Sequence, residues 1–250
     1  MTASIPQTDA GMAPSDDAIP EEYGSVLLNA GLFYRLSSEV IDAVIRDMHG
    51  IRLARGERLF NQGDPGDRLY IVLAGKVKLA QHLGHGKERL IALLGPGDQF
   101  GELSLLDPGP RMSTAVIIAD AYLAWLDKPA LHRWLTKHPE VAQQLLRVIA
   151  RRLRRTRTEL ADTIFVDVSG RVAKNLILLG RRFGTRAEEQ WQVPHDLTQT
   201  ELAQLVGASR ETVNKALSDF ANRGWLQIEQ GSVVILDPTR LKIRAGLTRR

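Results

Sequence analysis

The sequence predicts an α+β fold in which a β-rich N-terminal region and a smaller C-terminal region are connected by one long helix. Three observations predict it. Turn signals rich in glycine and proline separate short apolar runs throughout residues 51–126. An uninterrupted helical pattern follows over residues 139–164. Two short helices around a glycine, and then a short hairpin, occupy residues 196–236.

Composition places the chain among ordinary soluble globular proteins, with 44% hydrophobic and 25% charged residues in 250. No stretch is long and apolar enough for a transmembrane helix, and the first residues do not form a signal peptide, so we expect a cytoplasmic protein with no membrane partner. The absence of cysteine excludes disulfides and cysteine-ligated metal or iron–sulfur sites. We expect no metal site.

The positive charge is concentrated in the C-terminal part. Residues 169–250 contain 13 Lys and Arg against 8 Asp and Glu, whereas residues 1–168 contain 20 against 21. A basic surplus on one domain is typical of proteins that contact nucleic-acid phosphates.

The N-terminal half begins with a stretch, residues 1–22, whose small and polar composition predicts a flexible tail. An amphipathic helix is expected over residues 24–49. The domain that we assign to residues 23–138 then carries strong turn signals such as Gly63–Asp67 and Gly95–Asp98. Many short strands at near-regular spacing predict a β-roll (jelly roll) or β-sandwich. The inward face of the helix is expected to be formed by Val40, Ile41, Val44 and Ile45.

The segment 139–164 is predicted to be a dimerisation helix. One apolar stripe repeats along it at the spacing of a helix seam, which would accommodate one partner helix and make the protein a homodimer. Its arginines are interpreted as solvated flanks. A hinge is placed at residues 165–168, with Ser169 as the N-cap of a further helix over 170–183. The predicted seam consists of Leu145, Ile149, Leu153, Thr156, Leu160 and Thr163.

A helix-turn-helix is predicted over residues 196–217. Thr198 followed three residues later by Glu201 is a capping box, so the first helix begins there. Gly207 ends this helix, and Ser209 caps the second one. The alternative is an ordinary helical hairpin with a solvated face. The hairpin over residues 225–236 makes the module, residues 169–250, a winged helix.

The second helix of this motif has side chains suited to double-stranded DNA. Its N-terminal part enters the major groove in proteins of this architecture. Arg210 can donate to guanine O6 and N7, and Glu211 can accept from the cytosine amino group, so the pair suits G·C steps. Lys215 lies one turn further along.

A ligand-binding motif is expected within the β-rich domain, where Phe100–Ser104 is followed by Pro110–Ser113. Gly101 allows backbone amides to approach a ligand closely. Glu102 can accept a hydrogen bond from a ribose hydroxyl, and Arg111 can pair with a phosphate. From these residues alone, an ordinary turn with a surface arginine remains an equal alternative.

In this order, the parts strongly resemble the CRP/FNR family of transcription regulators, and most closely its actinobacterial global regulators. The resemblance covers about residues 24–240 and includes specific strings. They are Gly63–Tyr70, Asp107–Arg111, Phe165–Arg171 and Gly207–Leu217.

The resemblance implies an allosteric homodimer that binds a palindromic operator with TGTGA-like half-sites under control of a cyclic nucleotide, foremost cyclic AMP, with RNA polymerase as a further partner. Glu102 would bind the ribose 2′-hydroxyl, Arg111 the cyclic phosphate and Thr156 the adenine. The implied effector-binding residues are Gly101, Glu102, Leu103, Ser104, Arg111, Met112, Ser113, Thr156 and Arg157. The implied DNA-binding residues are Thr198, Ser209, Arg210, Glu211, Thr212 and Lys215, with Thr198, Ser209 and Thr212 on phosphates.

Two positions depart from the pattern of the family. Met112 stands where Ser or Thr is usual, and Arg157 stands where a small polar residue usually reaches across the dimer. Loss of a hydrogen bond to a charged group lowers affinity by about ten- to a hundredfold. Three hypotheses follow: weakened or altered binding of cyclic AMP, a different and more anionic effector, or DNA binding that needs no effector.

Other classes of protein fit less well. No catalytic triad, phosphate-binding glycine loop or zinc-protease motif occurs in a plausible context, so we expect no enzyme and no obligatory cofactor. A regulatory module of a kinase or channel would lack the winged helix. A haem or redox sensor is disfavoured because cysteine is absent and His82 and His85 lie near a turn.

Overall fold

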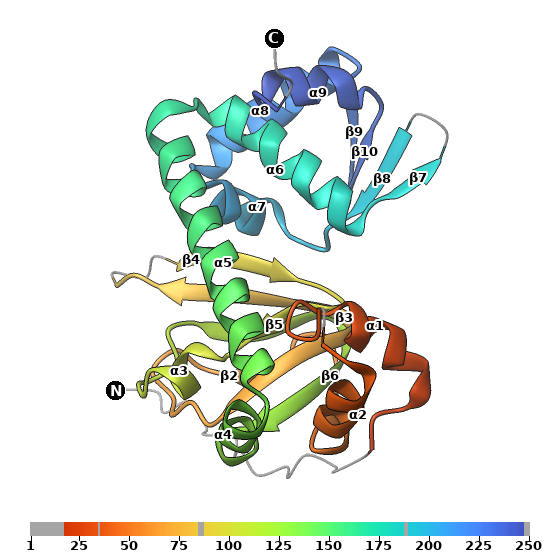
Figure 1. The fold of residues 1–250 in the computed structure, drawn as a ribbon. Coiled ribbons are helices and arrows are strands. Elements are labelled where there is room, and N and C mark those ends of the chain that lie inside the picture. Colours follow the sequence, from red (N-terminus) through yellow and green to blue (C-terminus); the bar gives the residue numbers. More distant parts are fainter. Residues whose placement is uncertain (1–17, 35, 85–87, 188–189, 248–250) are drawn as a thin grey trace.

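One helix of 27 residues, α5 (Pro139–Phe165), runs along the molecule and connects a β-rich N-terminal domain to a smaller C-terminal domain (Figure 1). The computed structural model describes residues 18–34, 36–84, 88–187 and 190–247. The predicted flexible tail lies almost entirely outside these residues, as does His85. The predicted helix over residues 139–164 agrees with α5 to within one residue.

The N-terminal domain is an antiparallel β-roll built around two long strands, β3 (Arg68–His82) and β6 (Thr114–Asp127). Among the described residues, its sheet has the order β1–β6–β3–β4, with β2 paired to β6 and β5 paired to β3. The remaining strands are β1 (His49–Leu53), β2 (Arg58–Phe60), β4 (Glu88–Leu94) and β5 (Gln99–Phe100).

Alternation along β3 gives the domain two apolar cores. Leu69 and Ile71 pack with the helices outside the sheet, whereas Tyr70 and Val72 pack inside the roll with Phe100. Successive side chains of a strand point to opposite faces, so one strand contributes to both cores. The outer face is covered by α1 (Gly24–Asn29), α2 (Ser38–Arg46), α4 (Lys128–Lys137) and the first turns of α5.

The single helix expected over residues 24–49 is wrong, because the structure has two helices there and a strand from His49. The first helix stops at Asn29, and Ala30 is already extended. Ser37 then caps a new helix by accepting from the Val40 amide. The N-cap at Ser37 begins a separate helix, which the apolar periodicity alone did not reveal.

The face of α5 predicted as a seam is also partly wrong. Leu145 is only 3% exposed because it packs on the β-roll, while its neighbour Leu146 is 66% exposed. Ile149 packs partly against the same core. The helix therefore has two apolar faces, one for its own domain and one exposed. The exposed face contains Leu146, Leu153, Leu160, Ile164 and Phe165.

The C-terminal domain begins with α6 (Val168–Phe183), whose N-cap is Asp167 and not Ser169 as predicted. One oxygen of Asp167 accepts from the Gly170 amide at 2.8 Å, and the other pairs with Arg244 at 2.5 Å. Asp is as favourable an N-cap as Ser, and the helix begins two residues before its predicted start. The helix α9 (Pro238–Arg244) packs against α6.

The rest of this domain combines the helix-turn-helix with a small sheet. The hairpin β9 (Leu226–Glu229) and β10 (Ser232–Ile235) confirms the predicted wing. A second hairpin, β7 (Thr185–Ala187) and β8 (Gln190–Pro194), was not predicted and completes a sheet of order β7–β8–β10–β9.

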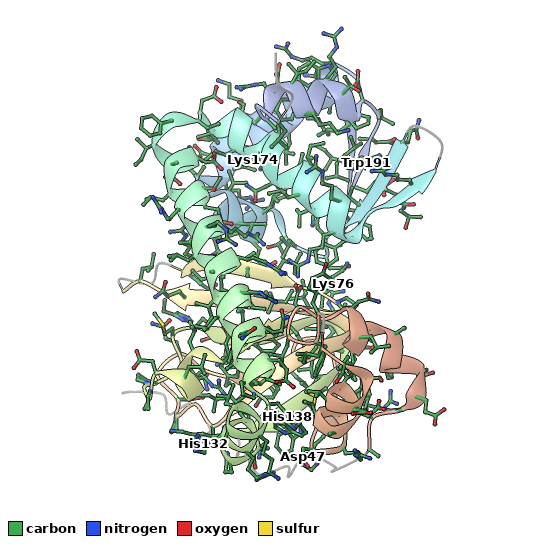
Figure 2. The ribbon with its side chains drawn as sticks, in the orientation of Figure 1. Asp47, Lys76, His132, His138, Lys174 and Trp191 are labelled. Atoms are coloured by element: carbon green, nitrogen blue, oxygen red, sulfur yellow. The ribbon has the colours of Figure 1, made fainter. Side chains whose placement is uncertain are left out.

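The two domains are in direct contact beside α5. Leu90, Leu93 and Ile118 of the β-roll belong to the same apolar cluster as the core of the C-terminal domain. Figure 2 shows Lys76 at this junction, where its ammonium group contacts Asp196 at 2.5 Å. Three further ion pairs tie the C-terminal domain to the β-roll or α5. They are Lys78–Glu201, Lys174–Asp162 and Arg182–Asp98.

Candidate effector pocket and DNA-binding surface

Arg111 is a buried arginine in the segment that precedes β6. Its two terminal nitrogens donate to the carbonyls of Gly101 and Arg68, each at 2.8 Å, and its guanidinium lies 4.4 Å from the centre of the Phe60 ring. Its buried Nε has no partner among the described residues. Burial lowers the pKa of Arg111 below its usual value, although nearby Tyr70 and acidic side chains oppose this. An anionic ligand would complete these interactions.

Gly101 explains how the arginine fits. Its φ of +83° is a left-handed conformation that favours glycine. A Cβ there would lie 2.7 Å from Nη1 of Arg111 and 3.0 Å from the Arg68 carbonyl oxygen. A side chain at position 101 would therefore displace the guanidinium.

Glu102 is completely buried at the start of α3 (Leu103–Leu106). Its Oε1 accepts from Nη1 of Arg152 at 2.5 Å, while its Oε2 is buried without a partner among the described residues. Arg152 also donates to the carbonyl of Gln99 at 2.8 Å. The long helix is thus bonded to the ligand motif of the β-roll.

Gln99 is the third residue here with a buried polar atom that lacks a partner among the described residues. It is almost fully buried, and neither polar atom of its amide has a partner in the described part of the chain. Buried polar groups are nearly always hydrogen-bonded, so unpaired ones indicate a missing ligand or water. Gln99, Glu102 and Arg111 each carry such an atom, and together they fit a polar, anionic ligand.

A cavity of about 340 Å³ lies between α5 and the β-roll, and it borders Gln99 and the Arg152 side chain that pairs with Glu102. Gln99 and Arg152 belong to its wall, and Thr156 lies on its α5 side. The apolar part of the wall is provided by Leu79, Ile91, Ala92, Leu94 and Val148. A cavity whose wall combines apolar side chains with polar and charged ones can accommodate a phosphorylated sugar that carries a flat base.

The other residues expected to bind the effector do not belong to the cavity wall. Leu103 and Met112 are largely exposed, Ser104 is buried with its hydroxyl 3.5 Å from the Pro110 carbonyl, and Ser113 is half-buried. Arg157 does not belong to the cavity wall. The structure brings together Gly101, Glu102 and Arg111, with Thr156 at the neighbouring cavity.

Two residues of this site were missed in the sequence. Arg152 was grouped with the solvated arginines, and Gln99 was not considered. A signal was present for Arg152, because it lies seven residues after the buried Leu145 and so shares the inward face of the helix.

The helix-turn-helix is formed by α7 (Gln199–Val206) and α8 (Arg210–Asn222). Both halves of the predicted capping box of Thr198 and Glu201 are present, and Gly207 has a φ of +71° at the end of α7. The hydroxyl of Ser209 accepts from the Thr212 amide at 3.2 Å and caps α8. These caps confirm the predicted local structure.

The candidate DNA-binding side chains lie on one exposed region of this motif. Arg210, Glu211 and Lys215 are exposed on α8, while Val213 and Leu217 are buried in the domain core. The remaining candidates have local partners. Thr198 bonds Glu201, and the hydroxyls of Ser209 and Thr212 lie 2.8 Å apart.

Comparison with known proteins assigns both domains. A family model described as cyclic nucleotide-binding domain matches residues 51–138, and one described as Crp-like helix-turn-helix domain matches residues 170–244. A CRP-like cAMP-activated global transcriptional regulator of Mycobacterium tuberculosis is 51% identical over 220 residues, covering 88% of this chain and 98% of the relative. This chain belongs to the CRP/FNR family of transcription regulators.

Further relatives agree with this family. The cyclic AMP receptor protein of Thermus thermophilus is 38% identical over 212 residues, covering 84% of this chain and 94% of the relative. The crystal structure of the Thermus thermophilus catabolite activator protein matches with a TM-score of 0.51 at 37% identity, over 88% of this chain and all of that one. FixK2 of Bradyrhizobium japonicum shares the fold, with a TM-score of 0.70 at 23% identity over 78% of this chain and 96% of that one.

Membership in the CRP/FNR family makes the protein a DNA-binding regulator with a cyclic nucleotide-binding domain, and not an enzyme. No helix in the described part of the chain is long and apolar enough to cross a membrane. Within the same residues, no group of three or more potential ligand side chains could hold a metal ion.

Proposed function

We propose that the protein is a homodimeric transcription regulator whose affinity for a two-fold symmetric operator is controlled by a cyclic nucleotide. The observation that carries this proposal is the set of buried polar atoms on Gln99, Glu102 and Arg111 that have no partner in the part of the chain that the structure describes. They lie where Arg152 joins the β-roll to α5. A ligand bound there would contact both the domain that senses and the helix that leads to the DNA-binding domain.

The phosphate, the ribose and the base of a cyclic nucleotide would each bind to a different part of this site. The phosphate would bind beside Arg111, and the ribose 2′-hydroxyl would donate to the free oxygen of Glu102. The base would enter the apolar part of the cavity, next to Thr156. Met112 is exposed, so we expect the phosphate to be bound without its side chain. Cyclic AMP is the effector named for the relatives and is the first nucleotide to test.

The proposed dimer would use the exposed face of α5. A monomer would leave Leu146, Leu153 and Leu160 in water over several turns of the helix. A parallel partner helix would bury these residues at heptad spacing.

Control by the nucleotide is proposed to be a shift between dimer states. The effector would favour the state in which it contacts both the β-roll and α5. Residues 165–168 would act as the hinge that sets the two α8 helices about one DNA turn, roughly 34 Å, apart. Arg210, Glu211 and Lys215 would then bind bases of TGTGA-like half-sites. As such a regulator, the protein would act in the cytoplasm and contact RNA polymerase.

Isothermal calorimetry on the full chain tests the nucleotide site. We expect heat of binding from cyclic AMP or cyclic GMP for the wild type, and a strongly weakened signal for Glu102→Gln. No heat from either nucleotide at millimolar concentration would contradict the proposal. It would favour the alternative of DNA binding without an effector.

A further inference from the structure

One ion pair at the junction of the two domains borders the cavity between α5 and the β-roll. Asp98 of the β-roll pairs with Arg182 near the end of α6, and both residues belong to the cavity wall. The other three ion pairs described at this junction contribute no residue to that wall. A side chain of the DNA-binding domain therefore lies within reach of a ligand in the cavity.

Asp98 ends a turn, residues 95–98, that immediately precedes the ligand motif of the β-roll. Its Oδ2 accepts from the Gly95 amide at 2.7 Å, and Gln99 follows it directly in the chain. Gly95 packs so closely against the ring of Phe183 that a Cβ at this position would overlap it. The turn thus holds the end of α6 by packing and by charge, next to the residues assigned to the effector.

Arg182 has a single acidic partner among the described residues, Asp98. Its side chain is 27% exposed, and burial lowers its pKa to about 10, so it is charged at neutral pH. Arginine only donates hydrogen bonds, and it binds carboxylates and the acceptor atoms of bases with the same planar group. With the phosphate of a nucleotide beside Arg111, the acceptors of the base would compete with Asp98 for these donors.

We propose that a bound nucleotide and Asp98 compete for Arg182, so that the effector contacts the DNA-binding domain directly and loosens its attachment to the β-roll. This inference rests on the proposed nucleotide site. It adds a connection between the two sites that does not pass through the hinge at residues 165–168. Because coupling between sites is reciprocal, loss of the Asp98 charge favours nucleotide binding, and nucleotide binding weakens the ion pair.

Calorimetry with cyclic AMP and cyclic GMP on the full-length wild type, Asp98→Asn and Arg182→Met tests the competition. Asp98→Asn frees the guanidinium and should tighten nucleotide binding several-fold, while the Asn side chain can still accept from the Gly95 amide. Arg182→Met removes the donors and should weaken nucleotide binding about tenfold or more. In the double variant, the gain from Asp98→Asn should be absent.

Lys174→Gln is the matched control. It breaks the ion pair with Asp162, which also holds the C-terminal domain but lies outside the cavity wall. Nucleotide affinity should stay at the wild-type value in this variant. Fluorescence anisotropy on a labelled operator without nucleotide gives a second measurement. Asp98→Asn and Arg182→Met both remove the restraint on α6, so both should bind the operator more tightly than the wild type.

Three results would overturn the proposal. Changes of nucleotide affinity in the same direction in Asp98→Asn and Arg182→Met, or no change in either, would show that the pair does not compete with the ligand. Operator affinity at or below the wild-type value in both variants would show that the pair does not restrain the DNA-binding domain. Failure of the wild type to bind either nucleotide would contradict the nucleotide site as well, and this result separates the two proposals.

Discussion

The effector pocket and the helix-turn-helix are built in different ways. The pocket joins distant segments, such as Glu102 and Arg152, 50 residues apart, and it contains buried polar atoms that have no partner among the described residues. The helix-turn-helix is built from the consecutive residues 198–222, with its caps satisfied and its candidate DNA-binding side chains exposed. The first site has polar atoms that a ligand could satisfy, whereas the caps and the exposed side chains of the second are already in place. Changes in the pocket should therefore alter the response, and changes in α8 should alter the choice of DNA sequence.

A single change on the exposed face of α5 should abolish both dimerisation and tight binding to the operator. Leu153→Asp would place a charge in the seam of the proposed dimer. We expect a monomer whose affinity for a two-fold operator falls more than about a hundredfold, because binding of two linked half-sites is lost. Sedimentation and fluorescence anisotropy on a labelled operator measure this.

Leu83→Asp is the matched control, because Leu83 is similarly exposed but lies on the β-roll. It should remain dimeric and bind the operator like the wild type. A dimeric Leu153→Asp with full operator affinity would refute the seam.

Glu102→Gln tests the pocket alone. The amide keeps the shape of the side chain but loses the charge that binds Arg152 and would accept from the ribose. Nucleotide affinity should fall about ten- to a hundredfold. Operator affinity without nucleotide should stay at the wild-type value. Asp107→Asn, an exposed change in the following turn, is expected to leave both affinities intact.

Arg210→Ala tests the helix-turn-helix alone. Loss of a base contact should cost about 1–3 kcal/mol and relax the sequence preference at one base pair. The nucleotide affinity of the free protein should not change. Binding to a set of operators with single substitutions measures this, with Arg223→Ala as a control that alters an exposed Arg–Asp pair at the end of α8. Discrimination equal to that of the wild type at every position would show that Arg210 does not contact a base.

The smallest effect is expected at the junction of the two domains, where Glu201 contacts Lys78 at 2.5 Å. Burial alone would raise the pKa of Glu201, but hydrogen bonds from Lys78 and Thr198 outweigh it and hold this pKa below its usual value of 4.5. The unfolded chain then takes up the proton more readily, so the stabilisation is present above about pH 4.5 and is lost as the pH falls below that value.

Glu201→Gln should therefore lower the free energy of unfolding by about 1 kcal/mol near pH 7, or roughly 2–4 °C in Tm. The difference from the wild type should shrink below pH 4.5. Thermal unfolding at several pH values measures it, and Gln can still complete the capping box. A difference in Tm that stays constant down to pH 3 would show that the charge of Glu201 is not involved.

The same difference in construction explains what the sequence could predict. Thr198, Glu201, Gly207 and Ser209 obey rules that act within three or four residues, so both helices were predicted with their caps. Glu102 and Arg111 were recognised as candidates because their residue types and motif point to nucleotide chemistry.

Several of the missed features depend on packing between distant segments. Arg152 became a pocket residue only because α5 lies across the β-roll, and Leu145 left the predicted seam for the same reason. Ser169 is not the N-cap, because α6 begins at Val168 and Asp167 accepts from the Gly170 amide; this second local cap signal was not considered. One-dimensional periodicity identifies an apolar face, but it does not say which neighbour covers it.

The coupling of the two sites is tested most directly by operator binding with and without nucleotide. A labelled TGTGA-N6-TCACA duplex would be titrated with the full-length protein at one stated salt concentration, in buffer alone and with saturating cyclic AMP or cyclic GMP. We predict tighter binding with at least one nucleotide in the wild type and no such gain in Glu102→Gln. Equal operator affinity in all three solutions would contradict the claim that the pocket controls the DNA-binding domain.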